Sequence, residues 1–103
     1  MYVASTAKRY FDLTIETERG EDIVLALKPP SVSALTELTS LAEAATAGKN
    51  VFGVLRGSVA DMLRRNKNGV EVPDEIIDDL DYDQLIGILQ AFLIWVREER
   101  AKN

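Results

Sequence analysis

The chain has 103 residues, of which 47% are hydrophobic and 28% charged, enough for one folded domain with a modest core. Its net charge is −5 and its pI is near 4.7, so the composition argues against nucleic-acid binding as the main role. Because cysteine and histidine are absent, disulfides, thiolate chemistry and the commonest general base and metal ligand are excluded.

The sequence also gives no sign of a membrane partner. No apolar run approaches the roughly 18 residues that a transmembrane helix needs. The first residues lack the charged and apolar regions of a secretory signal. We therefore expect a soluble, cytoplasmic protein.

Two short segments of alternating residues predict a β-hairpin near the start of the chain. Residues 1–8 show no periodicity and predict a flexible arm. Over Tyr10–Thr17, apolar and polar residues alternate as in a half-buried strand, and Ile23–Leu27 repeats the pattern. Gly20, in the charged turn between them, can adopt a positive φ. Because a two-stranded hairpin is marginally stable in water, we expect residues 10–27 to pack on helices or on another chain.

The first predicted helix covers residues 32–47 and follows two prolines that end the second strand. Ser31 or Ser33 suits its N-cap, and Gly48 suits the position just after its last turn. The apolar stripe becomes small toward the C-terminal end, which allows a neighbouring helix to approach closely. The stripe consists of Val32, Leu35, Leu38, Leu41, Ala42 and Ala45.

A second helix is predicted over residues 51–66, with Asn50 as its N-cap. Gly53 and Gly57 stand four residues apart within it. This spacing indicates either close packing against another helix or a helix slightly weakened by glycine. The apolar stripe consists of Phe52, Leu55, Val59, Met62 and Leu63.

The chain closes with a short helix over residues 73–80 and a long helix over residues 82–101. Pro73 suits the first position of the short helix. Asp81 and Gln84 have the spacing of a capping box at the start of the long helix. Apolar residues at three- and four-residue steps form its main stripe. These residues are Leu85, Ile88, Leu89, Phe92, Trp95 and Val96.

The long helix carries more apolar surface than a single stripe requires. Tyr82, Ile86 and Leu93 widen the stripe, and Ile94 projects on roughly the opposite side. Either this helix is buried nearly all round, or the excess binds another copy or a different protein. For the second alternative, the candidate partner-binding residues are Ile86, Phe92, Leu93, Ile94 and Trp95. Of these, Phe92 and Trp95 are equally compatible with a place in the core.

Together these elements predict a mainly α-helical domain of the α+β class over residues 9–103. In it, a hairpin over residues 10–27 packs on a bundle of three to four helices. The predicted order is hairpin, helix, helix, short helix and long helix. The sequence shows no internal repeat and no low-complexity segment.

The densest group of candidate ligands is the acidic segment 78–83. As a calcium loop starting at Asp79 it has oxygen ligands at three positions, but Gln84 and Gln90 replace the required glycine and bidentate glutamate. An acidic approach to a helix N-terminus explains the segment better. No phosphate-binding glycine loop is present, and the serines have no histidine to activate them. We therefore predict no catalytic residues, no metal site and no cofactor.

Charge is distributed along the chain in three blocks. The net charge is −3 over residues 1–48, +4 over residues 49–70 and −6 over residues 71–103. The basic and acidic blocks either pack within one molecule or favour head-to-tail association between copies. We favour the intramolecular alternative, because exposed charge pairs are individually weak evidence for an interface.

Three features of the sequence, in this order, resemble a known family. They are the hairpin at Tyr10–Leu27, the segment KPPS at 28–31 leading into a leucine-rich helix, and the closing helix. That helix is approached through LDYDQL at 80–85 and continues through AFLIWV at 91–96. Over most of its length, the chain resembles the small tail assembly chaperones of long-tailed bacteriophages.

The resemblance implies a mostly helical, non-catalytic protein that acts in the host cytoplasm during virion assembly and is absent from the finished particle. Its partners would be the long helical tape measure protein, which it keeps soluble, and the tail tube subunits that it helps recruit. Two other functions fit the residues. One is a self-assembling structural protein in which the hairpin edge and last helix pair between copies, and the other is a small protein-binding adaptor.

Overall fold

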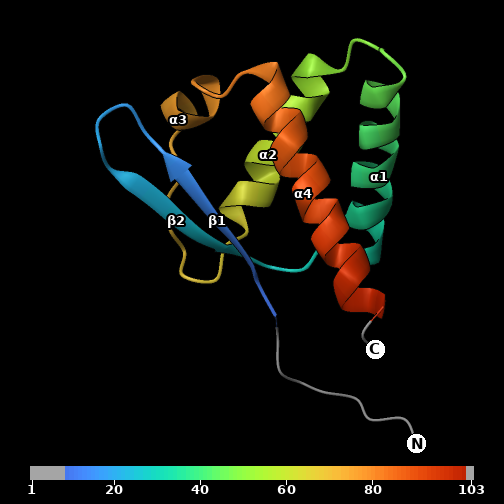
Figure 1. Ribbon diagram of the computed structural model, residues 1–103, viewed down its shortest axis with the longest axis horizontal. Coiled ribbons are helices and arrows are strands. Elements are labelled where there is room, and N and C mark those ends of the chain that lie inside the picture. The colour runs from blue at the N-terminus through green and yellow to red at the C-terminus, as the bar shows by residue number, and fades with distance from the viewer. Residues whose placement is uncertain (1–8, 102–103) are drawn as a thin grey trace, which may run out of the picture.

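The computed structural model describes residues 9–101 and contains an antiparallel β-hairpin followed by four helices (Figure 1). The predicted α+β class and the order of the elements are therefore confirmed. The arm predicted over residues 1–8 lies outside the described residues. The elements are β1 Phe11–Glu16, β2 Asp22–Leu27, α1 Val32–Thr46, α2 Phe52–Arg64, α3 Asp74–Asp78 and α4 Tyr82–Ala101.

The hairpin has one face on the helices and one face in water. Its strands pair from Phe11 opposite Leu27 to Glu16 opposite Asp22. The connecting turn uses Gly20 at a φ of +80°, as predicted. Because side chains alternate along each strand, the larger apolar ones of β1 and most of those of β2 fall on the face that packs against the core. The acidic ones fall on the other face, together with Val24, which is exposed.

The chain after α2 forms an unexpected continuation of the sheet. The helix predicted to reach residue 66 ends two residues earlier. The backbone N–H of Lys28 donates to the carbonyl of Arg65 at 2.9 Å, and the N–H of Lys67 donates to the carbonyl of Ala26 at 2.8 Å. These bonds to the outer edge of β2 replace the helical bonds that two further residues of α2 would have made.

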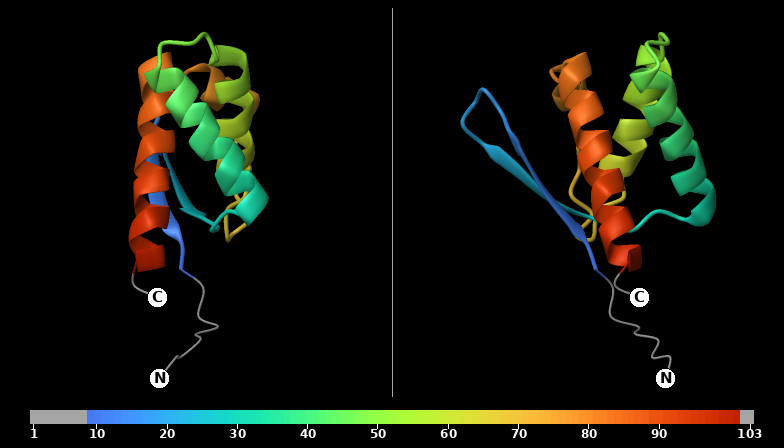
Figure 2. Two further views of the ribbon diagram at one scale, coloured as in Figure 1. Left: turned by 90° about the vertical axis from the view of Figure 1, so that its right-hand side faces the viewer. Right: turned by 45° about the vertical axis from the view of Figure 1, so that its right-hand side comes forward.

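The core lies between the hairpin and the three longer helices. Figure 2 shows the hairpin on one side of α4, with α1 and α2 on the other side. α4 contacts both α1 and α2, and α2 also contacts β2. None of the helices within residues 9–101 combines the length and the apolar character needed to cross a bilayer. The largest fully buried side chains are Phe92, Leu25, Leu27, Leu55, Leu63, Ile77, Leu85 and Leu89.

The predicted capping residues of α1 and the predicted N-cap of α4 are confirmed. Ser31 Oγ accepts the backbone N–H of Ala34 at 3.1 Å, and Gly48 follows α1 with a φ of +81°. At the start of α4, Asp81 Oδ1 accepts the N–H of Gln84 at 2.8 Å, and Gln84 Oε1 accepts the N–H of Asp81 at 2.9 Å. The two bonds form the reciprocal capping box that the spacing predicted.

The predicted N-cap of α2 is wrong, and one of the two alternatives for its glycines is excluded. Asn50 is not its N-cap, because the first helical bond runs from the N–H of Leu55 to the carbonyl of Val51, which has no capping side chain. Gly53 and Gly57 are exposed, and nothing lies within 4 Å of a Cβ built on either residue. The alternative of close helix packing at these glycines is therefore excluded.

The start of β1 and the end of α4 lie at the same end of the molecule (Figure 1). Arg9 Nε and Glu99 Oε2 are 3.3 Å apart. Phe11 packs edge-on against Phe92 at 5.7 Å between ring centroids, and its ring lies 5.8 Å from that of Trp95. These contacts fix the entrance to the hairpin against the second half of α4.

Candidate protein-binding surfaces

The structure divides the five candidate partner-binding residues into two groups. Phe92 is only 1% exposed, and Trp95 is half-buried against the Phe92 and Phe11 rings. Ile86 is also half-buried and packs against the core. These three residues serve the fold. The expectation that Phe92 lies on a surface of α4 is wrong, because its ring is enclosed by other elements.

The other two candidates, Leu93 and Ile94, line an open groove between α1 and α4. Ile94 is 50% exposed, while Leu93 is half-buried at the edge of the core. We call this hollow of about 630 Å³ the α1–α4 groove. It is lined by Thr39, Ala42, Glu43, Thr46, Ala47, Gln90, Leu93, Ile94 and Arg97.

The α1–α4 groove exists because α1 carries small side chains where it passes α4. Ala42 and Ala47 present only methyl groups, and the hydroxyl of Thr46 is satisfied within the helix by the carbonyl of Ala42 at 2.9 Å. The wall on α1 extends over nine residues and the wall on α4 over eight, about 10–12 Å at the rise of an α-helix. Glu43 and Arg97 add one charge of each sign. The groove therefore has the length and the apolar lining to take about two turns of a helix.

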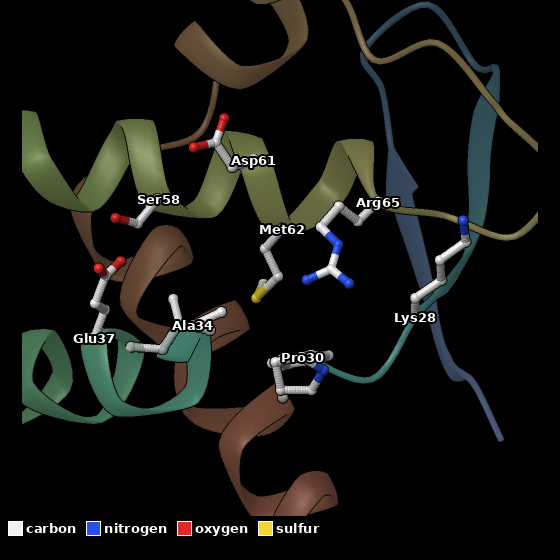
Figure 3. Close-up of a pocket in the computed structure, with 10 residues that line it drawn as sticks. Lys28, Pro30, Ala34, Glu37, Ser58, Asp61, Met62 and Arg65 are labelled. Carbon is white, nitrogen blue, oxygen red and sulfur yellow. The ribbon is translucent and has the colours of Figure 1, made fainter. Parts of the chain in front are cut away.

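A second, smaller hollow of about 130 Å³ lies between the start of α1 and the second half of α2 (Figure 3). Leu38, Met62 and Phe92 supply its apolar lining. Two cations, Lys28 and Arg65, stand on one side, and Figure 3 shows them across Met62 from two carboxylates. We call it the α1–α2 pocket. Its lining consists of Lys28, Pro30, Ala34, Glu37, Leu38, Ser58, Asp61, Met62, Arg65 and Phe92.

At the opposite end of α2 two aromatic side chains are exposed side by side. The rings of Phe52 and Tyr82 stack with centroids 6.2 Å apart and an interplanar angle of 27°. Phe52 is 46% exposed and Tyr82 is 36% exposed. The sequence placed Phe52 in the buried stripe of α2, which is wrong, because this first turn extends beyond the core. We call these two residues the aromatic pair.

Part of the acidic segment before α4 is neutralised by α2. Arg56 binds Asp78 through both Nε at 2.7 Å and Nη2 at 2.6 Å, and Arg64 Nη2 lies 2.7 Å from Asp74 Oδ1. The hydrogen bond and the charge of Arg64, with a smaller contribution from Arg56, lower the pKa of Asp74 below its ordinary value of 3.8. These pairs fasten α3 to α2. Within the described part of the chain, no group of three or more acidic side chains is arranged to hold a metal ion.

Comparisons with known proteins supply no relative. No protein-family model matches the chain, and neither the curated proteins nor the solved structures give a match. Three surfaces of the fold are candidates for binding a partner. Those surfaces are the α1–α4 groove, the α1–α2 pocket and the aromatic pair.

Proposed function

We propose that this protein is a non-catalytic tail assembly chaperone that binds the tape measure protein and keeps it soluble. It would also help recruit tail tube subunits, act in the cytoplasm and be absent from the mature virion. The order of hairpin, proline-led helix and acidic approach to the last helix supports this proposal from the sequence. From the structure, one observation carries it. Ile94 is half exposed beside Leu93 in the α1–α4 groove, so apolar surface of the last helix is open to a partner.

An amphipathic helix of the tape measure protein is the occupant that fits the α1–α4 groove. Helices recognised in grooves contribute apolar side chains at i, i+3 or i+4, and i+7, which span about 10 Å. The small residues Ala42 and Ala47 let a third helix approach α1 closely. Glu43 and Arg97 can pair with charges that flank the apolar stripe of the partner.

The charge of the chain suits a chaperone of this kind. A protein that covers apolar segments of a long partner must keep the complex dispersed. The net charge of −5 opposes association of such complexes through mutual repulsion. One small molecule can therefore bind an apolar segment in the α1–α4 groove while its net negative charge keeps the complexes apart.

The proposal is tested by co-expression with the cognate tape measure protein, with soluble yield and co-purification as readouts. Ile94→Asp places a charge in the α1–α4 groove, and Thr46→Arg blocks it sterically while suiting the C-terminal end of α1. Because one buried apolar side chain is worth about 1.5–3 kcal/mol, each variant should weaken binding by about tenfold or more. Val32→Asp is the matched control, since Val32 is 84% exposed and lies outside the groove.

The expected result is that the wild type and Val32→Asp solubilise the partner and that both groove variants do not. Circular dichroism of the purified variants separates loss of binding from loss of folding. If the wild-type protein leaves the tape measure protein insoluble, the proposed function is wrong. If the wild type succeeds and Ile94→Asp and Thr46→Arg succeed equally, the partner binds elsewhere on the molecule.

A further inference from the structure

A row of three polar side chains crosses the outer face of the sheet at the open end of the hairpin. The backbone N–H of Lys28 donates to the carbonyl of Arg65, and Leu27 pairs with Asn66 in an isolated bridge. Continuing the register of the hairpin by one residue places Tyr10 on the other side of Lys28. Because side chains alternate along extended segments, these three lie on the face opposite Leu27 and Asn66, which are buried.

The row lines an open hollow of about 250 Å³, together with Pro29. We call this hollow the basic pocket. Tyr10 is half-buried, and both Lys28 and Arg65 are exposed. Arg65 Nη2 lies 3.5 Å from the carbonyl oxygen of Pro29, which holds the guanidinium against one wall. A third cation, Lys67, lies beside the pocket with its Nζ 5.0 Å from the centroid of the Tyr10 ring.

The three cations are not neutralised within the described part of the chain. Lys28, Arg65 and Lys67 form no ion pair there, although the chain has 17 acidic residues and only 12 basic ones. Lys28 and Arg65 also stand opposite each other on adjacent segments, where like charges destabilise the pairing. A bound anion would remove this repulsion.

Carboxylates flank the basic pocket and confine an anion to it. On one side, Asp12 occupies the next position along the same outer face of the hairpin. On the other side, Glu37 and Asp61 line the α1–α2 pocket, which shares its two cations with the basic pocket (Figure 3). An anion is therefore repelled from both flanks and attracted to the row of cations between them.

We infer that the basic pocket binds a phosphate group. A phosphate dianion balances the charges of Lys28 and Arg65, whereas a single carboxylate would leave one positive charge over. The guanidinium of Arg65 can donate to two phosphate oxygens at once, and the ammonium of Lys28 and the hydroxyl of Tyr10 supply further donors. The inference is independent of the proposed function, because the basic pocket shares no residue with the α1–α4 groove.

The size of the basic pocket limits what can carry the phosphate group. At about 250 Å³ it lies below the range of pockets that enclose drug-sized ligands. Inorganic phosphate fits, and so does a small phosphate monoester whose organic part lies against Pro29 and the Tyr10 ring. Both ligands present the same charged group, and their relative affinities distinguish them.

Backbone amide NMR spectra, recorded in low-salt buffer during titration with inorganic phosphate and with phenyl phosphate, test the inference. Both ligands should bind with a Kd of about 1 mM or below and should shift the amide signals of Tyr10, Lys28 and Arg65. Acetate, which carries one charge, should bind at least about tenfold more weakly. Tighter binding of phenyl phosphate would show that the pocket selects an ester, and equal affinities would show that it recognises the phosphate group alone.

Four variants locate the binding site. Lys28→Gln and Arg65→Gln should each weaken phosphate binding by about tenfold, because each removes charge-assisted hydrogen bonds. Asp12→Asn removes a repelling charge and should tighten binding by about two- to threefold. Arg19→Gln is the matched control, since it makes the same change in net charge at an exposed position in the turn at the far end of the hairpin. Its affinity for phosphate should equal that of the wild type.

The inference is overturned if both phosphate ligands bind more weakly than about 10 mM, or if acetate binds as tightly as they do. It is also overturned if Arg19→Gln weakens binding as much as Arg65→Gln, because the attraction would then come from the overall charge. Circular dichroism confirms that each variant is folded. Ile94→Asp should leave phosphate binding unchanged, and Arg65→Gln should leave capture of the tape measure protein unchanged, so the two proposals fail separately.

Discussion

Asn66 shows how one side chain fixes the backbone between α2 and α3. It is 4% exposed, and its Nδ2 donates to the carbonyls of Leu63 at 3.1 Å and Val70 at 2.8 Å. Its Oδ1 accepts the N–H of Val70 at 2.6 Å. Both polar atoms of this buried amide therefore form hydrogen bonds. Its side chain holds the turn after α2 by bonding to backbone groups on both sides of the turn.

Replacing Asn66 by Leu should destabilise the protein by about 2–3 kcal/mol, because three backbone groups lose their partner in a buried setting. Urea unfolding monitored by circular dichroism measures the loss. Asn68→Leu is the control in the same turn, and since Asn68 is exposed it should change the free energy of unfolding by less than about 0.5 kcal/mol. Equal effects of the two variants would show that the amide of Asn66 is not specially used.

Gly57 is a position at which a substitution should stabilise the protein. It lies inside α2, is exposed, and has nothing within 4 Å of an added Cβ. Gly57→Ala should therefore raise the free energy of unfolding by about 0.5–1 kcal/mol in thermal or urea unfolding. Gly20→Ala should lower it, because a φ of +80° is strained for any residue with a Cβ. A destabilising Gly57→Ala would mean that α2 is packed at this position in solution.

Neither the burial of Asn66 nor the exposure of Phe52 could be predicted from the sequence. Asn66 reads as an ordinary turn residue, since its burial results from the pairing of residues 65–67 with β2, which is distant in the chain. Phe52 has the same periodicity as the buried Leu55 and Val59, but periodicity identifies the face of a helix and not how far the core extends along it.

Among the secondary-structure elements, α3 depends most on its neighbours. It has five residues, too few to form a stable helix alone, and Ile77 is its one fully buried side chain. The pairs of Arg64 with Asp74 and of Arg56 with Asp78 hold it against α2. The attachment of α3 should therefore weaken when these carboxylates are neutralised.

The pH dependence of stability should report the pair at Asp74. Because Arg64 lowers the pKa of Asp74 in the folded protein, its contribution is fully present above the ordinary value of 3.8 and is lost as the pH falls through the lower folded value. Asp74→Asn should be less stable than the wild type at neutral pH, and the difference should vanish on acidification. Urea unfolding at a series of pH values measures this convergence.

Arg64→Gln provides the matched variant for this prediction. It should also be less stable than the wild type at neutral pH, and the double variant should lose less than the sum of the two single losses, because both substitutions remove the Arg64–Asp74 pair. Strictly additive losses would contradict the pairing of Arg64 with Asp74.

The elements themselves were largely predictable because their signals are local. Alternation identified both strands, and the capping residues Ser31 and Asp81 marked the starts of α1 and α4. The errors at the two ends of α2 have another origin. Its N-terminal end lacks a capping side chain, and its C-terminal end is set by hydrogen bonds to β2, a tertiary contact that no local pattern contains.

For the whole molecule, the three charge blocks are only partly neutralised from within. Arg56 and Arg64 of the basic block pair with the acidic block through α3, as the intramolecular alternative requires. Lys49, Arg65 and Lys67 form no ion pair within residues 9–101, although Lys67 lies 5.0 Å from the centroid of the Tyr10 ring. Charge therefore remains available for contacts between molecules.

The candidate surfaces could be predicted less well than the fold. The sequence identified Leu93 and Ile94, because excess apolar character on one helix is visible locally. It could not identify the α1–α4 groove or the α1–α2 pocket, since both depend on how the helices cross and on which small residues face each other. Helical periodicity placed Phe92 in the main stripe and Ile94 on the opposite side, but it could not decide whether Phe92 lay in the core, where the structure buries it against Phe11.

The contact between Arg9 and Glu99 has a consequence for protein engineering. Since this ion pair joins the start of the hairpin to the last turns of α4, the described chain has both of its ends at the same end of the molecule. A short linker could join its two ends, and a cut in the exposed turn at Gly48 would then create a circular permutant that keeps every helix and both strands. Such a permutant would carry its new termini beside Phe52 instead of beside the entrance to the hairpin.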